Sequence, residues 1–180
     1  MKRKLSLFLA LSLFVLSACQ PQTTPQPTEM EGEAFELYLV ADAQMAGADL
    51  QNYELDELPL AEEPILTTED IAQYDWENHT IDLTTPAYNQ MLAIFSRGMP
   101  MSGVPFVIVS HGQRIYAGAF WSPASSLSFD GIVILQPADP TAGTLFIVLG
   151  YPGGDFFTGE DPRDDPRLRE ALDIAGVLTE

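Results

Sequence analysis

The chain of 180 residues has one cysteine, Cys19, and almost no lysine. A single cysteine cannot form a disulfide within the chain. If a modification consumes Cys19, nucleophilic cysteine chemistry and thiolate metal sites are excluded as well. Both lysines, Lys2 and Lys4, precede residue 5, so the rest of the chain has no candidate for Schiff-base chemistry or for a Ser-Lys dyad. The folded part must therefore be held together by its hydrophobic core.

Basic side chains of any kind are scarce. The sequence contains 26 Asp and Glu residues against 8 Lys and Arg, and its formal net charge is −18. Phosphate binding requires a basic patch, so nucleic acid and anionic membrane surfaces are excluded as partners of the folded part. This acidity is typical of a soluble, solvated surface. Adaptation to high salt or to divalent cations is the alternative interpretation.

The motifs of common catalytic and metal sites are also missing. The only histidines are His79 and His111, with no HExxH or HxxxH pairing, and there is no GxSxG elbow, phosphate loop or DxDxDG calcium loop. We interpret both histidines as structural or solvent-exposed. Ser110 and His111 are neighbours, so on a strand they would point to opposite faces and could not form a nucleophile–base pair. The sequence predicts no catalytic residue, no metal ligand and no cofactor.

The N-terminal segment is typical of a secretory signal. Residues 2–4 are basic and residues 5–16 are apolar, a stretch too short to span a hydrocarbon core of about 30 Å. Residues 16–19 (Leu-Ser-Ala-Cys) resemble the lipobox of bacterial lipoproteins, in which the cysteine becomes the lipidated first residue after cleavage. The resemblance implies a signal peptide at 1–18 and a lipid on Cys19. An ordinary signal peptide with an incidental cysteine is the alternative.

Three segments follow from this assignment. Residues 19–33 are rich in Pro, Gln and Thr after the cysteine, and we expect them to form a disordered tether. Residues 34–180 are expected to form a single domain. The predicted location is the extracytoplasmic side of the cell membrane, which is the outer membrane in a Gram-negative cell. The chain would contact the membrane through the lipid on Cys19.

The domain is predicted to be α+β, with a mostly antiparallel sheet and two or three short helices packed on it. Apolar segments with strand-like patterns occur at 35–42, 79–83, 104–110, 114–121, 131–137 and 144–152. One helix is expected to begin after Thr84, with Pro86 in its first turn, and to end at Arg97-Gly98. Its buried stripe is predicted to be Tyr88, Met91, Leu92 and Phe95.

Two further helices are expected. The acids after Thr67 and Thr68 suit a helix N-terminus, so a short helix is predicted to end near Trp76. Another helix is predicted over residues 166–175, with an inward face formed by Leu168, Leu172 and Ala175.

Residues 104–121 are predicted to form the central hairpin. A type II′ turn at Gly112-Gln113 would pair Ile108 with Ala117 and Phe106 with Ala119. Both faces of this hairpin are apolar, so each must be covered, either by this chain or by a partner. The candidate interaction surface on this hairpin consists of Tyr116, Phe120 and Trp121.

Two resemblances to known proteins add to these predictions. The segments EEPILTTEDIAQYDWENHTIDLT and GVPFVIVSHGQRIYAGAFWSPASS are similar to a group of uncharacterised bacterial secreted or lipid-anchored proteins, over most of residues 35–134. That group implies no activity. The order of residues 66–71, 82–84 and 107–119 is similar to the extracytoplasmic head region of the SecD-type protein-export subunit. That likeness implies a ferredoxin-like α+β sandwich and contact with polypeptides. It does not imply transport, because the multispanning part and its proton-relay carboxylates are missing.

These observations favour a non-enzymatic, lipid-anchored interaction module with an extracytoplasmic protein partner. The alternative is a lipoprotein that binds a small molecule or a divalent cation through acidic loops, such as those at 42–56 and 155–165. An unclassified hydrolase is the third hypothesis. It would require His79, His111 and Ser110 to converge from separate elements.

Overall fold

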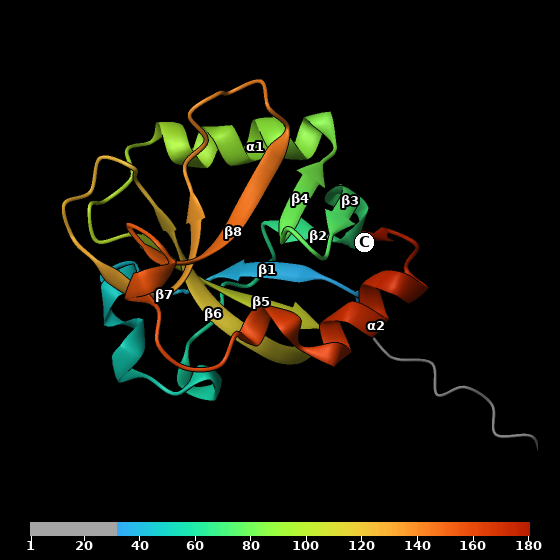
Figure 1. Ribbon diagram of the computed structural model, residues 1–180, viewed down its shortest axis with the longest axis horizontal. Helices are drawn as coiled ribbons and strands as arrows, with labels where there is room; N and C mark the ends of the chain where they lie inside the picture. Colours follow the sequence, from blue (N-terminus) through green and yellow to red (C-terminus); the bar gives the residue numbers. More distant parts are fainter. Residues whose placement is uncertain (1–31) are drawn as a thin grey trace, which may run out of the picture.

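The computed structural model describes residues 32–180, which form a single sheet with two α-helices packed against it (Figure 1). The predicted signal peptide, Cys19 and the tether as far as residue 31 lie outside the described residues. Within residues 32–180, no helix is both long and apolar enough to cross a bilayer.

The sheet has nine strands in the order β2-β1-β5-β6-β7-β8-β4-β3-β9. Only the β6–β7 and β3–β9 pairs are parallel among the described residues. The strands are β1 (Glu36–Leu39), β2 (Leu66–Thr67), β3 (Ile71–Asp75), β4 (Thr80–Leu83), β5 (Val104–Ser110), β6 (Gln113–Trp121), β7 (Phe129–Leu135), β8 (Thr144–Tyr151) and β9 (Leu178–Thr179). The helices are α1 (Thr85–Ser96) and α2 (Pro166–Ile174), with 3₁₀ turns η1 (Gly47–Asn52), η2 (Leu55–Glu57), η3 (Thr68–Asp70), η4 (Gly154–Phe156) and η5 (Pro162–Asp164).

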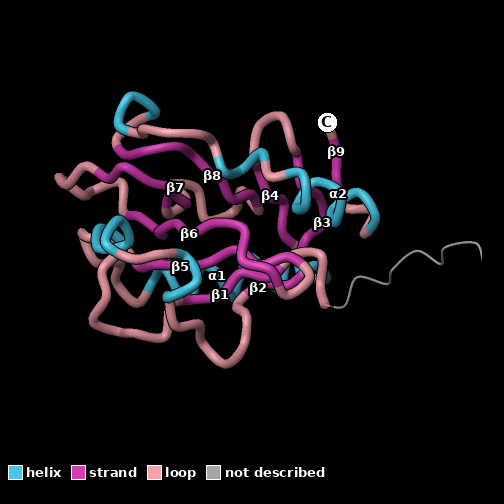
Figure 2. The backbone as a smooth tube through the Cα atoms, turned by 90° about the horizontal axis from the view of Figure 1, so that it is seen from below, coloured by secondary structure: helices cyan, strands magenta, loops and turns pink. Residues whose placement is uncertain are grey.

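The sheet is strongly rolled. Strand β2 begins the strand order and β3 is next to its other end, yet only the three residues of η3 join them. Four Cα steps reach at most about 15 Å. Seven strand spacings in a flat sheet would amount to about 34 Å. The sheet must therefore curl until its two ends approach each other, and Figure 2 shows the strands in this succession from β2 to β9.

Two apolar cores result from this curvature. The larger core lies inside the roll, where Phe106, Phe120 and Ile132 pack against Met91 and Phe95 of α1. The smaller core lies on the outer face of the central strands. The main part of its cover is the segment that contains η1 and η2, which contributes Leu50 and Leu58.

The predicted α+β class with a mostly antiparallel sheet is confirmed. Helix α1 has Pro86 in its first turn and buries Tyr88, Met91 and Phe95, as expected, while Leu92 is half-buried. Helix α2 buries Leu168 and Leu172. The prediction for Ala175 was wrong, because the helix ends before it and Ala171 is buried instead.

The predicted helix ending near Trp76 was also wrong. Thr67 and Asp70 form the expected capping box, but it closes only the single 3₁₀ turn η3. From Ile71 onward the chain becomes β3, which pairs with β4 on one side and β9 on the other. The sequence signal for a helix start is therefore correct, but the chain pairs with the sheet instead of continuing as a helix.

The central hairpin exists, but its turn lies one residue earlier than predicted. Ser110 pairs with Gln113, so the two turn residues are His111 and Gly112, both with positive φ (46° and 72°). Positive φ at both positions is the requirement of a type I′ turn. This turn alone would pair Ile108 with Ile115, and a bulge at Ile115 shifts the partner of Ile108 to Tyr116, whereas Ala117 was predicted.

The order of elements differs from the one that the second resemblance implies. A ferredoxin-like fold runs β-α-β-β-α-β. Here four strands precede α1, four lie between α1 and α2, and only β9 follows α2.

Candidate functional site

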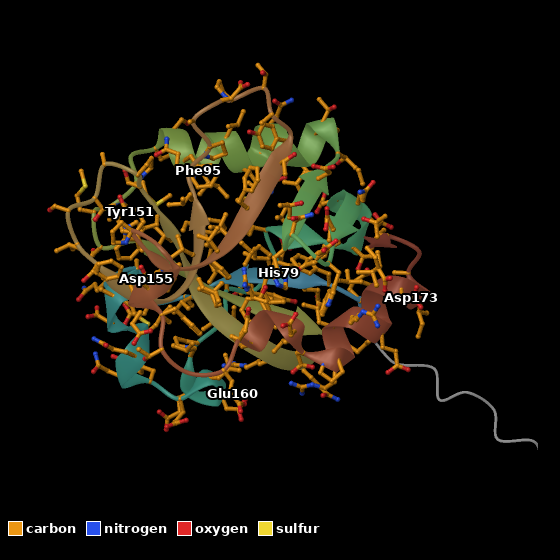
Figure 3. All side chains as sticks on the ribbon, viewed as in Figure 1. His79, Phe95, Tyr151, Asp155, Glu160 and Asp173 are labelled. Atoms are coloured by element: carbon orange, nitrogen blue, oxygen red, sulfur yellow. The ribbon has the colours of Figure 1, made fainter. Side chains whose placement is uncertain are left out.

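His79 closes the tight turn between β3 and β4. It has a φ of +49°, and Asp75 stabilises the turn by accepting hydrogen bonds from the Asn78 backbone N–H and side-chain Nδ2, both at 2.9 Å. The imidazole packs edge-on against Trp76, with the ring centroids 6.0 Å apart. Only 8% of the residue is exposed, so the turn buries an ionisable ring, which is labelled in Figure 3.

Arg163 brings an acidic segment to this turn. Its guanidinium forms a bidentate pair with Asp161 (Nε–Oδ1 2.9 Å and Nη2–Oδ2 2.6 Å) and donates from Nη1 to the carbonyl of Ile147 at 2.6 Å. The Ile147 N–H in turn donates to the His79 carbonyl at 3.0 Å. Strand β8 is thus the common support that holds η5 beside His79.

The result is a cluster of His79, Asp161 and Asp164, which we call the His79 cluster. The Nε2 atom of His79 is 3.7 Å from Oδ1 of Asp164, and one potential ligand atom from each residue lies within 4.8 Å of the others. Asp164 is largely exposed, with 62% of its side chain accessible, so the cluster opens to solvent on that side.

The electrostatics of the cluster keep its imidazole neutral. Burial lowers the pKa of His79, the positive charge of Arg163 lowers it further, and nearby carboxylates only partly oppose these effects. Burial alone would raise the pKa of Asp161, but the hydrogen bonds and charge of Arg163 outweigh it and the pKa is lowered. A neutral ring with a free lone pair therefore faces two carboxylates and one guanidinium.

Two tyrosines lie beneath the cluster. Tyr74 of β3 is fully buried, and Tyr116 of β6 is 3% exposed. Burial raises the pKa of both hydroxyls, and the Arg163 charge acts on both in the opposite direction. Neither hydroxyl has a hydrogen-bond partner of normal geometry within residues 32–180. Both phenols are therefore neutral at physiological pH, and they are close enough to feel the charges of Arg163 and Asp161.

A second feature is an apolar groove beside Phe146 and Val148 of β8, which we call the Phe146 groove. It has a volume of about 550 Å³, and its apolar lining is Pro123, Leu135, Pro137, Ala142, Phe146 and Val148. Phe146 is 53% exposed. It shares the outer face of β8 with Val148, which packs against the smaller core. The groove is therefore a part of the outer apolar face that residues 32–180 leave uncovered.

The predicted interaction surface does not exist as an exposed surface. Tyr116, Phe120 and Trp121 are 3%, 0% and 0% exposed. Tyr116 and Phe120 face the larger core, and Trp121 faces the smaller one. This prediction was wrong because both faces of the hairpin are covered: the larger core buries Tyr116 and Phe120, and the η1–η2 segment covers the face that carries Trp121.

The two histidines do not converge. His111 lies in the β5–β6 turn, where its Nδ1 is 3.0 Å from the Gly32 carbonyl oxygen, and Ser110 pairs with Gln113. Among the contacts of residues 32–180, none joins His79 to His111 or Ser110. The structure thus gives the hydrolase hypothesis no assembled nucleophile and base.

The two acidic loops differ in role. In the 42–56 loop, Asp42 and Asp49 accept hydrogen bonds from nearby backbone N–H groups. The 155–165 loop supplies Asp161 and Asp164 to the His79 cluster. Of the two acidic loops considered from the sequence, only the second lies beside a histidine, and Arg163 and Phe146 were not recognised. The apolar pattern around Phe146 gives no sign that its side chain faces outward.

Comparisons of the chain with protein-family models, with curated proteins and with solved structures found no match.

Proposed function

We propose that this protein is a lipid-anchored, non-enzymatic binding module on the extracytoplasmic side of the membrane. The Phe146 groove would receive an apolar side chain of a partner protein flanked by Lys or Arg residues. The observation that carries the proposal is the uncovered apolar strip on β8, with Phe146 at 53% exposure. Exposed aromatics in a shaped apolar surface are typical anchors of protein interfaces.

The polar groups at the groove favour a protein over a small molecule. Small-molecule sites combine an apolar pocket with a few unpaired polar groups that fix the orientation of the ligand. Here Thr144 already donates to Asp82 at 2.5 Å, and Asp139 already accepts from Thr141 at 2.8 and 2.6 Å. The groove therefore offers mainly shape and apolar area, which an inserted apolar side chain can fill.

The charge of the chain determines the rest of the partner's chemistry. With a net charge of −18, the protein attracts segments with flanking basic residues and repels acidic ones. Asp139 at the rim of the groove is placed to contact such a residue. Binding is therefore expected to weaken as salt is added, with the apolar contact persisting.

Replacing Phe146 with glutamine should weaken the binding of peptides that the groove selects. We expect the wild-type protein to enrich peptides with an aromatic or aliphatic residue next to Lys or Arg from a random phage-displayed dodecapeptide library. Synthetic copies of these peptides should bind Phe146→Gln at least about tenfold more weakly, because a central aromatic anchor is worth about 2 kcal/mol or more.

The matched control is Phe156→Gln, which changes a phenylalanine of 46% exposure outside the groove. It should bind the selected peptides as the wild type does. Equal losses in the two variants, or no sequence preference in the enriched peptides, would contradict the proposed groove function.

The anchor has its own test. In bacteria supplied with an alkyne-tagged palmitate, the wild-type chain should acquire the tag and Cys19→Ser should not. Cys19 is the only cysteine, so no other thiol can carry an acyl chain. A labelled Cys19→Ser protein, or an unlabelled wild type beside a labelled lipoprotein control, would show that the lipobox assignment is incorrect.

A further inference from the structure

We propose that His79, Asp161 and Asp164 form a binding site for a divalent first-row transition metal ion. This site is separate from the Phe146 groove and does not depend on it. The cluster joins the β3–β4 turn to η5, two segments about 80 residues apart in the sequence, through their common contact with β8.

The spacing of the ligand atoms fits a single small cation. His79 Nε2 and Asp164 Oδ1 are 3.7 Å apart, and all three ligand atoms lie within 4.8 Å of one another. Ligands about 2.1 Å from a tetrahedral zinc ion are about 3.4 Å apart. Small side-chain adjustments therefore suffice, and exposed Asp164 has the freedom to make them.

The histidine provides an independent indication of a ligand. His79 is 8% exposed, yet its imidazole makes no hydrogen bond of normal geometry to any residue of 32–180. The Nε2 atom faces Asp164 at 3.7 Å without a hydrogen bond, so this nitrogen is available to a ligand held between the two residues.

The donor set selects the class of metal. Calcium and magnesium prefer sites built entirely of oxygen ligands, whereas an imidazole nitrogen beside carboxylates suits zinc and its first-row neighbours. Open coordination positions on the Asp164 side leave room for water. The site is therefore expected to prefer Zn²⁺ to Ca²⁺ and Mg²⁺.

Two features limit the affinity. Arg163 already pairs with both oxygens of Asp161, so the metal must use the remaining lone pairs beside a positive charge. His79 Nδ1 has no hydrogen-bond acceptor within the described chain, and metal-bound histidines without such support bind about 10–100-fold more weakly. We expect micromolar rather than nanomolar binding.

Isothermal titration of the full chain without a polyhistidine tag, purified in detergent, tests the site. Zn²⁺ should bind with a stoichiometry of one. Both His79→Asn and Asp164→Asn should weaken binding at least about tenfold. Asparagine tolerates the left-handed backbone at residue 79 and keeps the turn intact. Asp164→Asn changes an exposed side chain, so it reports on the metal even if the histidine variant folds poorly.

The matched control is His111→Asn, because His111 is the other histidine and also has a positive φ (46°) in a hairpin turn. It should bind Zn²⁺ as the wild type does, and so should Phe146→Gln. The proposal is overturned if the wild type binds no Zn²⁺, if His79→Asn binds like the wild type, or if His111→Asn loses binding equally. Tighter binding of Ca²⁺ than Zn²⁺ that depends on Asp164 would also overturn it.

Discussion

Replacing Trp121 with alanine is expected to lower the free energy of unfolding by about 3–5 kcal/mol. The indole is fully buried and stacks on Phe129, with the ring centroids 5.1 Å apart and the planes at 9°. It also packs against Tyr151 at 5.8 Å. Gly103 leaves the space that the ring fills, since a Cβ there would lie 2.4 Å from the indole. The alanine variant would therefore leave a large cavity in the smaller core.

Urea unfolding followed by circular dichroism measures this loss. Trp121→Phe is the conservative comparison, and it should cost less because it keeps the stacking and removes an indole N–H that has no partner within residues 32–180. Phe156→Ala changes a ring of 46% exposure and should stay within about 0.5 kcal/mol of the wild type. A Trp121→Ala protein of wild-type stability would show that the indole does not stabilise the core, and Trp121 would again be a candidate for partner binding.

Replacing Arg163 with methionine is expected to lower the free energy of unfolding by about 2–4 kcal/mol. The arginine side chain is 12% exposed, and the Asp161 side chain that it neutralises is 24% exposed. Removing one partner of a largely buried ion pair leaves the other charge without compensation. The Ile147 carbonyl also loses its donor, so η5 is released from β8.

A double-mutant cycle separates this cause from a general loss of packing. The variant that combines Asp161→Asn with Arg163→Met removes the unpaired charge, so it should be more stable than Arg163→Met alone. The coupling energy between the two sites should be at least about 1 kcal/mol. Additive effects of the two substitutions would show that the ion pair is not what holds η5 in place.

The regular elements were largely predictable from the sequence, because their signals are local. Alternation of apolar residues located most strands of the sheet, and the stripe at Tyr88, Met91 and Phe95 located α1. The hairpin between β5 and β6 was also predicted, but its turn was not. Gly112 was expected to open the turn, whereas His111 precedes it in the left-handed region. A non-glycine residue in that conformation carries no strong sequence signal.

The candidate site could not be predicted, because its geometry depends on long-range contacts. His79 lies beside Asp161 and Asp164 because β8 pairs with β4 and because Arg163 donates a hydrogen bond to the Ile147 carbonyl. The apolar pattern around Phe146 also does not indicate that its side chain is exposed. Apolar residues on both faces of β8 suggest burial on both sides, and only the arrangement of the covering segments shows which one stays exposed.

The described chain begins at one end of the domain. The His111 N–H donates to the Glu33 carbonyl at 2.8 Å, so residue 33 is fixed at the turn between β5 and β6. From there β6 runs for nine residues to Trp121, a distance of about 25–30 Å, and Pro123 of the groove follows directly. If Cys19 carries a lipid, the chain enters the domain at this turn, and the groove lies at the far end of β6 from the attachment. We then expect the membrane attachment to leave the apolar groove accessible to partners.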